Sequence, residues 1–167
     1  MFAVGDVIIY GTHGICTVIA TEKRIVDRRD VEYYVLEPRE QECDRFYVPT
    51  QNMAACAKMR KLLTVDEINS LLRSDDVHQD IWVADDGKRK QQYRDILTGG
   101  DRSAILCMVH TLHKHRKEQL DAGRKMHMID EGFLRDAEKL LNAEFSYVLG
   151  ISKDRIAQYV LDTMETV

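Results

Sequence analysis

The sequence of 167 residues contains only two prolines and one tryptophan, and it has no long apolar run. No stretch approaches the ~20 apolar residues that a membrane-spanning helix needs. The first residues lack a basic region followed by a long apolar segment, so we expect no secretory signal, no membrane association and a cytoplasmic protein. Few prolines, nearly balanced charge and apolar residues spread along the chain argue against a disordered protein.

Cysteine is scarce, and its spacing argues against disulfides and zinc. The four cysteines lie far apart without a CxxC pair, at Cys16, Cys43, Cys56 and Cys107. In a reducing compartment we expect free thiols. His110 and His113 share the face of a predicted helix, but no carboxylate or cysteine completes a set of metal ligands. We therefore expect neither a metal ion nor another cofactor.

Patterns typical of catalytic sites are also absent. The sequence has no GxSxG motif, no HExxH motif and no carboxylate pair in a glycine-rich loop. The segment from Gly11 to Gly14 lacks the GxxxxGK[ST] pattern of a phosphate-binding loop and joins two predicted strands, which favours a tight turn. The sequence thus predicts a protein that is not an enzyme and has no small-molecule substrate.

Charge is distributed unevenly although the net charge is only −4. Residues 88–125 hold ten basic and four acidic side chains, whereas residues 1–50 hold six basic and nine acidic ones. Such asymmetry between the two parts of a chain indicates two surfaces with different partners.

The first fifty residues predict a small all-β structure. Apolar and β-branched runs at 7–10, 15–20, 31–36 and 46–48 are separated by turn residues. Short strands at such spacing are typical of a meander that curls into a small barrel.

The rest of the chain predicts helices. Thr64 and Glu67 form a capping box at a helix start. Further helices are expected from 88 to 97, from 101 to about 122, from 130 to 150 and from 152 onward, with Gly100, Gly123 and Gly150 near their ends. The predicted fold class is therefore α+β in two domains, with a β-barrel at 1–56, a helix and linker at 57–80, and an all-helical domain at 81–167.

The opening of the chain resembles that of CarD-like bacterial transcription regulators. The residues that carry this resemblance are Phe2, Val4-Gly5-Asp6, Val7-Ile8-Ile9-Tyr10, His13-Gly14-Ile15-Cys16, Tyr33-Tyr34-Val35-Leu36 and Val48-Pro49. A looser resemblance in the helical part rests on Trp82, Tyr93, Asp130-Glu131, Ala137-Glu138, Glu144 and Leu149-Gly150. In this family the opening is an RNA-polymerase-interacting domain, a Tudor-like (SH3-like) β-barrel also found in transcription–repair coupling factors.

The resemblance implies a binding mode for the first domain. The barrel would bind the β subunit of RNA polymerase by extending its sheet against a lobe of that subunit. Arg24 falls where relatives place an arginine that contacts the polymerase. Tyr47 stands where they have a second arginine, and Arg45 lies nearby. We therefore expect Arg24, Arg45 and Tyr47 to bind the polymerase.

The resemblance also implies that the helical domain touches promoter DNA, with a tryptophan as a wedge in the minor groove. Trp82 is the only tryptophan, but it lies about four residues upstream of the expected position, and Asp85 and Asp86 follow it. Two interpretations of Trp82 stay open, insertion into DNA or packing against the protein. The basic residues that follow either contact phosphates without reading sequence or form a solvated helix face. The predicted DNA-binding residues are Trp82, Lys88, Arg89, Lys90 and Arg94.

These features predict a regulator that binds the polymerase β subunit and modulates the stability of the open promoter complex. The alternative is a protein-interaction module that binds polymerase without touching DNA.

Overall fold

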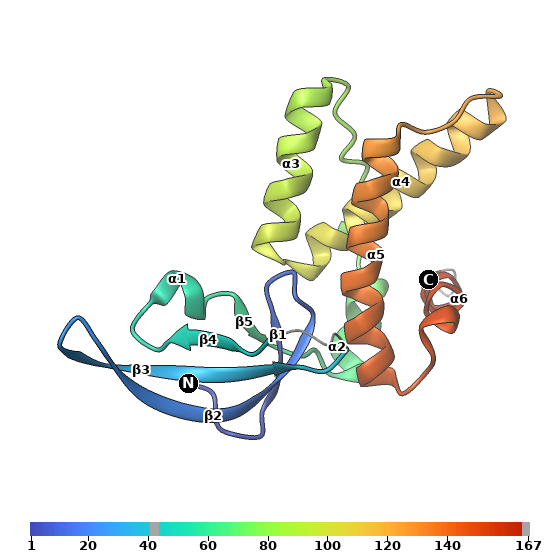
Figure 1. Cartoon of the computed structure of the whole chain (residues 1–167). Coiled ribbons are helices and arrows are strands. Elements are labelled where there is room, and N and C mark those ends of the chain that lie inside the picture. The colour runs from blue at the N-terminus through green and yellow to red at the C-terminus, as the bar shows by residue number, and fades with distance from the viewer. Residues whose placement is uncertain (41–43, 165–167) are drawn as a thin grey trace. The chain divides into compact units, whose positions relative to one another are not determined.

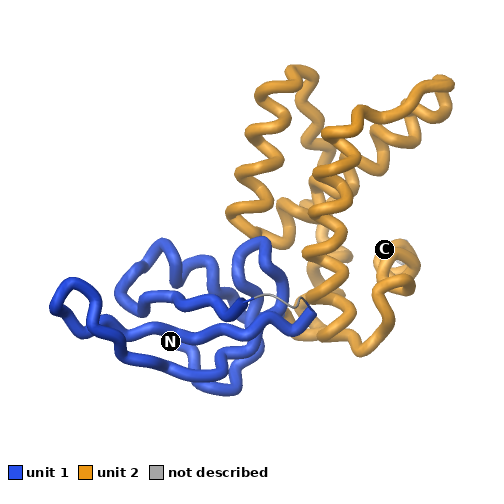
Figure 2. Tube along the Cα trace, viewed as in Figure 1, with its two compact units in different colours: residues 1–62 blue, residues 63–167 orange. Residues whose placement is uncertain are grey.

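The computed structural model describes residues 1–40 and 44–164. The chain divides into two compact units, Met1–Leu62 and Leu63–Val167, here called the sheet unit and the helical unit (Figure 2). All strands belong to the first unit, and the described part of the second is helical, so the predicted α+β class with two domains is confirmed. The sequence placed the end of the first domain at residue 56, whereas the first unit runs to Leu62 because a last strand follows that residue.

The sheet unit is built on five antiparallel strands in the order β4-β3-β2-β1-β5 (Figure 1). The strands are β1 (Val7–Tyr10), β2 (Ile15–Val26), β3 (Arg29–Pro38), β4 (Phe46–Pro49) and β5 (Met59–Lys61), and the short helix α1 (Met53–Cys56) separates the last two. One face carries the core of the unit, formed by Ile8, Cys16, Val18, Tyr34, Leu36, Val48 and Met59.

The sheet is not closed, so the structure does not confirm the predicted barrel. Strands β4 and β5 form opposite edges, and no pairing joins them within the residues that the structure describes. They are only four and three residues long. Closing a sheet requires strands long enough to tilt and stagger around a ring.

Strands β2 and β3 form a longer ribbon than the sequence predicts. Their turn consists of Asp27 and Arg28, whose φ angles of 49° and 62° place both in the left-handed region. Two such residues make the tight turn that matches the twist of a hairpin. The usual sequence signal is Asn-Gly or Asp-Gly, so Asp-Arg did not reveal it.

A β-bulge at Ile19 decides which side chains of β2 face the core. Val18 pairs with Leu36, but Ala20 pairs with Val35, so the register shifts between them. Because side chains alternate along a strand, one extra residue moves every later side chain to the opposite face. Val18 therefore faces the core, whereas Glu22 and Arg24 lie on the face that we call the outer face.

Local sequence signals place the helices well. The elements are α2 (Val65–Leu72), the 3₁₀ helix η1 (Asp75–His78), α3 (Asp86–Gly99), α4 (Arg102–Asp121), α5 (Met128–Leu149) and α6 (Lys153–Met164). Thr64 and Glu67 form the predicted capping box, Asp101 caps α4, and Gly100 and Gly150 take the left-handed conformation after α3 and α5. No helix within the described residues is both long and apolar enough to cross a membrane.

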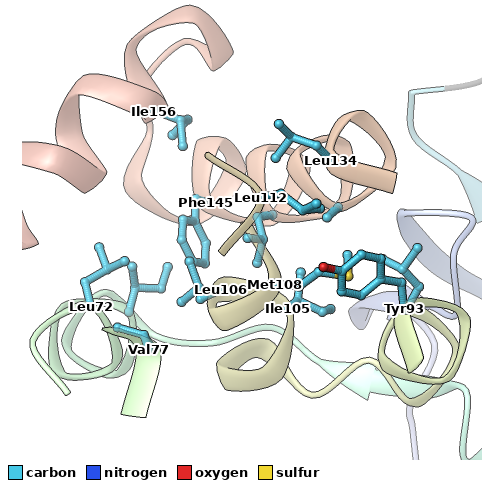
Figure 3. Packing of buried hydrophobic residues seen from close by; sticks show 14 of the residues in the cluster. Leu72, Val77, Tyr93, Ile105, Leu106, Met108, Leu112, Leu134, Phe145 and Ile156 are labelled. Atoms are coloured by element: carbon cyan, nitrogen blue, oxygen red, sulfur yellow. The ribbon is translucent and has the colours of Figure 1, made fainter. Parts of the chain in front are cut away.

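The helices enclose one apolar core, part of which is drawn in Figure 3. Its most deeply buried side chains come from every helix of the unit and include Leu72, Val77, Tyr93, Met108, Leu112, Ala137, Phe145 and Ile156. Most isolated helices of these lengths are only marginally stable in water. The helical unit therefore owes its stability mainly to this core, in which all its helices pack together.

Tyr93 is a polar exception within this core. Its side chain is fully buried, and its hydroxyl has no hydrogen-bond partner within the described chain. Burial disfavours the phenolate and raises the pKa of Tyr93 to about 12. We expect Tyr93→Phe to raise the free energy of unfolding by about 1 kcal/mol, because an unsatisfied buried hydroxyl is removed without a change of shape. Urea denaturation followed by tryptophan fluorescence measures this.

Tyr159 offers a matched control for that substitution. Its hydroxyl donates a hydrogen bond to the side-chain oxygen of Asn69, so Tyr159→Phe is expected to lower the free energy of unfolding by about 1 kcal/mol. A loss of stability in both variants would show that the Tyr93 hydroxyl has a partner after all.

Candidate functional sites

The outer face of the sheet unit brings together residues from β2 and β4. The guanidinium of Arg24 donates to Glu22 Oε2 through Nη2 at 2.9 Å, and its central carbon lies 3.9 Å from the centroid of the Tyr47 ring. The hydrogen bond to Glu22 raises the pKa of Arg24 above its usual value. A cation over an aromatic face is held in a defined position, although both side chains remain substantially exposed. Two predicted residues, Arg24 and Tyr47, thus meet, and Glu22 is a partner that the sequence did not suggest.

The third predicted residue lies on the same face. Arg45 is two residues before Tyr47, and its Nη2 donates to Glu37 Oε1 at 3.1 Å. Both side chains are about half exposed. Such exposed ion pairs contribute little to stability, so these charges can exchange their partners for those of another protein at low cost.

The sheet also leaves a margin of backbone groups without strand partners. Strand β1 covers β2 only through Thr17, with two further backbone hydrogen bonds at Val18. Within the described residues, β2 beyond this point pairs only with β3. Among the described strands, none pairs with the outer edge of β4 either. Such edges are templates for a strand of another chain. The bulge and the charges along β2 limit unspecific pairing there.

In the helical unit, Trp82 is enclosed between two other side chains. Its ring stacks on the imidazole of His115 with a centroid distance of 3.6 Å, and the guanidinium carbon of Arg89 lies 4.2 Å from its centroid. Two planar groups this close to one centroid must occupy opposite faces of the ring, because each face has room for one. The ring is also packed against the apolar core. This geometry favours the packing interpretation of Trp82.

Hydrogen bonds fix the backbone on both sides of this ring. The Ile81 backbone N–H donates to Thr111 Oγ1 at 3.0 Å, and the Trp82 backbone N–H donates to Asp80 Oδ1 at 3.0 Å. Asp80 also accepts from Lys114 at 2.6 Å. Hydrogen bonds from Lys114 and from the Trp82 backbone lower the pKa of Asp80. Trp82 is therefore anchored along α4 and is not a free wedge in this conformation.

Arg89, another predicted DNA contact, is buried in this structure. Its side chain is only 3% exposed and pairs with Asp130, which is 1% exposed, through two hydrogen bonds of 3.0 and 2.9 Å. It also donates to Asp86 and to the Val83 carbonyl, each at 2.8 Å. Burial alone would lower the pKa of Arg89, but the hydrogen bonds to Asp130 and Asp86 raise it above its usual value. All its donors point into the protein, so Arg89 is a structural residue here.

Trp82→Ala is expected to lower the free energy of unfolding of the helical unit by about 2–3 kcal/mol, because it removes a large packed ring and the contact with Arg89. Circular dichroism at 222 nm under urea measures this loss without the tryptophan signal. Trp82→Phe, which keeps a ring in the stack, should lose less. A shorter open-complex lifetime at unchanged stability would instead favour the wedge.

The remaining basic residues of α3 do not form one patch. Lys88 and Arg94 are exposed and Lys90 is half-buried. Lys90 and Arg94 lie one turn apart on one side of the helix. Lys88 lies on another side, where it lines a groove between α3 and α4 together with Gln91 and Asp95. These three side chains can reach phosphates, but not from a single surface.

The predicted cysteine states can be compared directly. Cys16, Cys56 and Cys107 form no disulfide among the described residues, as predicted, and Cys43 lies outside those residues. In the histidine cluster, His113 pairs with Glu138 at 2.7 Å, and burial lowers the pKa of His110. The described residues contain no group of three or more side chains arranged to hold a metal ion.

An open sheet with an unpaired margin and a charged, aromatic outer face has the features of a domain that binds another protein by adding a strand. Residues 2–63 match the CarD-like/TRCF RID domain family, and this segment coincides with the sheet unit. The sheet unit is therefore similar to the RNA-polymerase-interacting domain of CarD-like and TRCF proteins. No curated protein matches the chain.

Proposed function

We propose that this protein is a transcription regulator that acts by binding alone, without a catalytic step or cofactor, in the cytoplasm. The sheet unit docks on the β subunit of RNA polymerase by strand addition. The helical unit then contacts promoter DNA without reading its sequence and changes the stability of the open complex. The observation that carries the proposal is the family match of the sheet unit together with its unpaired margin next to Arg24 and Tyr47.

Tethering explains how a protein of net charge −4 acts on DNA. Once the sheet unit is docked, the helical unit has a high effective concentration near the promoter. Its own affinity for DNA can then be low, and a few exposed cations such as Lys88, Lys90 and Arg94 are enough to position it on phosphates.

A binding experiment with the full chain tests the docking step. We expect Arg24→Glu to weaken binding to RNA polymerase by about ten-fold or more, because a charge at the interface is reversed. Lys23→Glu is the matched control, since it changes the same charge one residue earlier, on the opposite face of β2. Equal affinities of the two variants would contradict docking through the outer face.

The second candidate is a module that binds polymerase without touching DNA. The burial of Arg89 and the enclosed ring of Trp82 favour it, because two of the predicted DNA contacts are engaged within the protein. Promoter footprinting with polymerase, with and without this protein, separates the two candidates. Protection that depends on the protein supports the proposal, and an unchanged footprint supports the second candidate.

A further inference from the structure

The end of α4 and the connection to α5 extend beyond the other helices of the helical unit (Figure 1). We call residues 116–129 the α4–α5 corner. Nearly all its side chains are exposed, and Met126, which is 6% exposed, is the main anchor to the core. The last two turns of α4 are not stabilised by packing against the core. A binding partner would explain why the helix extends this far.

Large apolar side chains are exposed at this corner. Leu120 is 61%, Met128 84% and Ile129 49% exposed. Met128 and Ile129 occupy the first turn of α5, directly before Asp130, which the buried ion pair with Arg89 fixes. Single exposed apolar side chains are common on protein surfaces. Adjacent ones on a rigidly held backbone indicate a contact surface more strongly.

Four cations lie in the same segment as these apolar residues. Arg116, Lys117, Arg124 and Lys125 are all exposed, and none of them forms an ion pair within the part of the chain that the structure describes. Arg116 and Leu120 lie one turn apart on the same side of α4, whereas Glu118 lies on the opposite side. The segment also holds two exposed acidic side chains, Glu118 and Asp121, so its cations exceed its acidic side chains by two.

We infer that the α4–α5 corner binds duplex DNA, with Met128 and Ile129 inserted in the minor groove and the four cations on the flanking phosphates. The inference rests on the proposed function, since it names the surface with which the helical unit meets DNA. Charge complementarity selects the partner. The cations of the α4–α5 corner match the phosphates of a nucleic acid, and its exposed apolar side chains match the stacked bases in the groove. Apolar side chains flanked by basic ones are the device with which minor-groove proteins unstack a base step. The corner would then supply the wedge that the enclosed Trp82 does not.

The test measures the affinity of the full chain for a short mixed-sequence duplex by fluorescence anisotropy over a series of salt concentrations. The double variant Arg124→Glu/Lys125→Glu should reduce the log–log salt slope by about 1.8, since each phosphate contact contributes about 0.9. The control Arg73→Glu/Lys139→Glu changes the net charge equally at exposed positions elsewhere in the helical unit, and it should keep the wild-type slope.

The apolar contacts are tested separately. Met128→Ala/Ile129→Ala should leave the salt slope unchanged, weaken binding by about ten-fold and abolish the increase in fluorescence of a 2-aminopurine base that reports unstacking. Met53→Ala is the control, because Met53 is as exposed as Met128 but lies in the sheet unit. Circular dichroism checks that each variant is folded.

The outcomes separate this inference from the proposed function. DNA binding by the wild type, with corner variants that behave like their controls, would overturn the inference and leave the proposed function standing. Absence of any binding by the wild type would overturn the inference but not the proposed function, in which docking on polymerase compensates for a low affinity for DNA. Weaker binding of Arg124→Glu/Lys125→Glu to polymerase without DNA, at unchanged DNA affinity, would show that the corner is a protein contact.

Discussion

Asp130→Ala is expected to lower the free energy of unfolding of the helical unit by about 3–5 kcal/mol, because it leaves the buried guanidinium of Arg89 without its main counter-ion. Asp130 supplies two of the hydrogen bonds of Arg89, and both side chains are almost completely buried. Trp82 is the only tryptophan, lies in this unit and contacts Arg89. Its fluorescence under urea therefore reports unfolding of the affected unit.

Two further variants isolate the cause of this loss. Asp86→Ala removes the other carboxylate that Arg89 contacts, but Asp86 is exposed, so only a small change is expected. The double variant Arg89→Met/Asp130→Leu removes both buried charges and should recover much of the stability, as replacement of buried ion pairs by apolar residues often does. A loss for Asp130→Ala no larger than that for Asp86→Ala would contradict the predicted role of the pair.

Glu144→Ala is the second substitution with a large expected effect, a loss of about 2–3 kcal/mol in the free energy of unfolding. Glu144 is 1% exposed and accepts hydrogen bonds from Arg102 at 3.1 and 3.0 Å. It also accepts from the backbone N–H of Leu63 at 2.9 Å. The substitution therefore leaves a cation and a backbone donor without this partner, at the point where the chain enters the helical unit.

The loss should be smaller than for Asp130→Ala because Arg102 is 16% exposed and water can reach it. Glu144→Gln keeps acceptor atoms for Leu63 and Arg102 and should lose less than Glu144→Ala. The same urea experiment measures both variants. Equal stability of Glu144→Ala and wild type would mean that water replaces the carboxylate fully.

Features with a local physical cause could be predicted from the sequence. The capping box at Thr64, the cap at Asp101 and the glycines after α3 and α5 all act on backbone groups within a few residues. The strand positions follow from apolar runs between turn residues. Strand β5, with only three residues and two of them charged, has no such pattern and was missed.

Features that depend on distant partners could not be predicted. The sequence assigned Asp130 to a helix start as a cap, but α5 begins at Met128 and the carboxylate of Asp130 binds Arg89, 41 residues away. Nothing in the neighbourhood of either residue distinguishes a capping aspartate from a buried one. For the same reason, Arg89 was grouped with Lys88 and Lys90 as an exposed cation.

The bulge at Ile19 makes the number of residues that follow it in β2 more important than the bulged residue itself. A substitution at Ile19 would leave Arg24 beside Tyr47. A deletion of Ile19 would remove the extra residue, so Val18 and Ala20 would follow each other in a regular ladder and Arg24 would stay on the outer face. A deletion of Thr21 would instead exchange the two sides of the strand beyond Ala20 and turn Arg24 away from Tyr47. Related proteins that dock with the same surface can therefore differ at the bulge, but they should keep the number of residues between the bulge and the arginine.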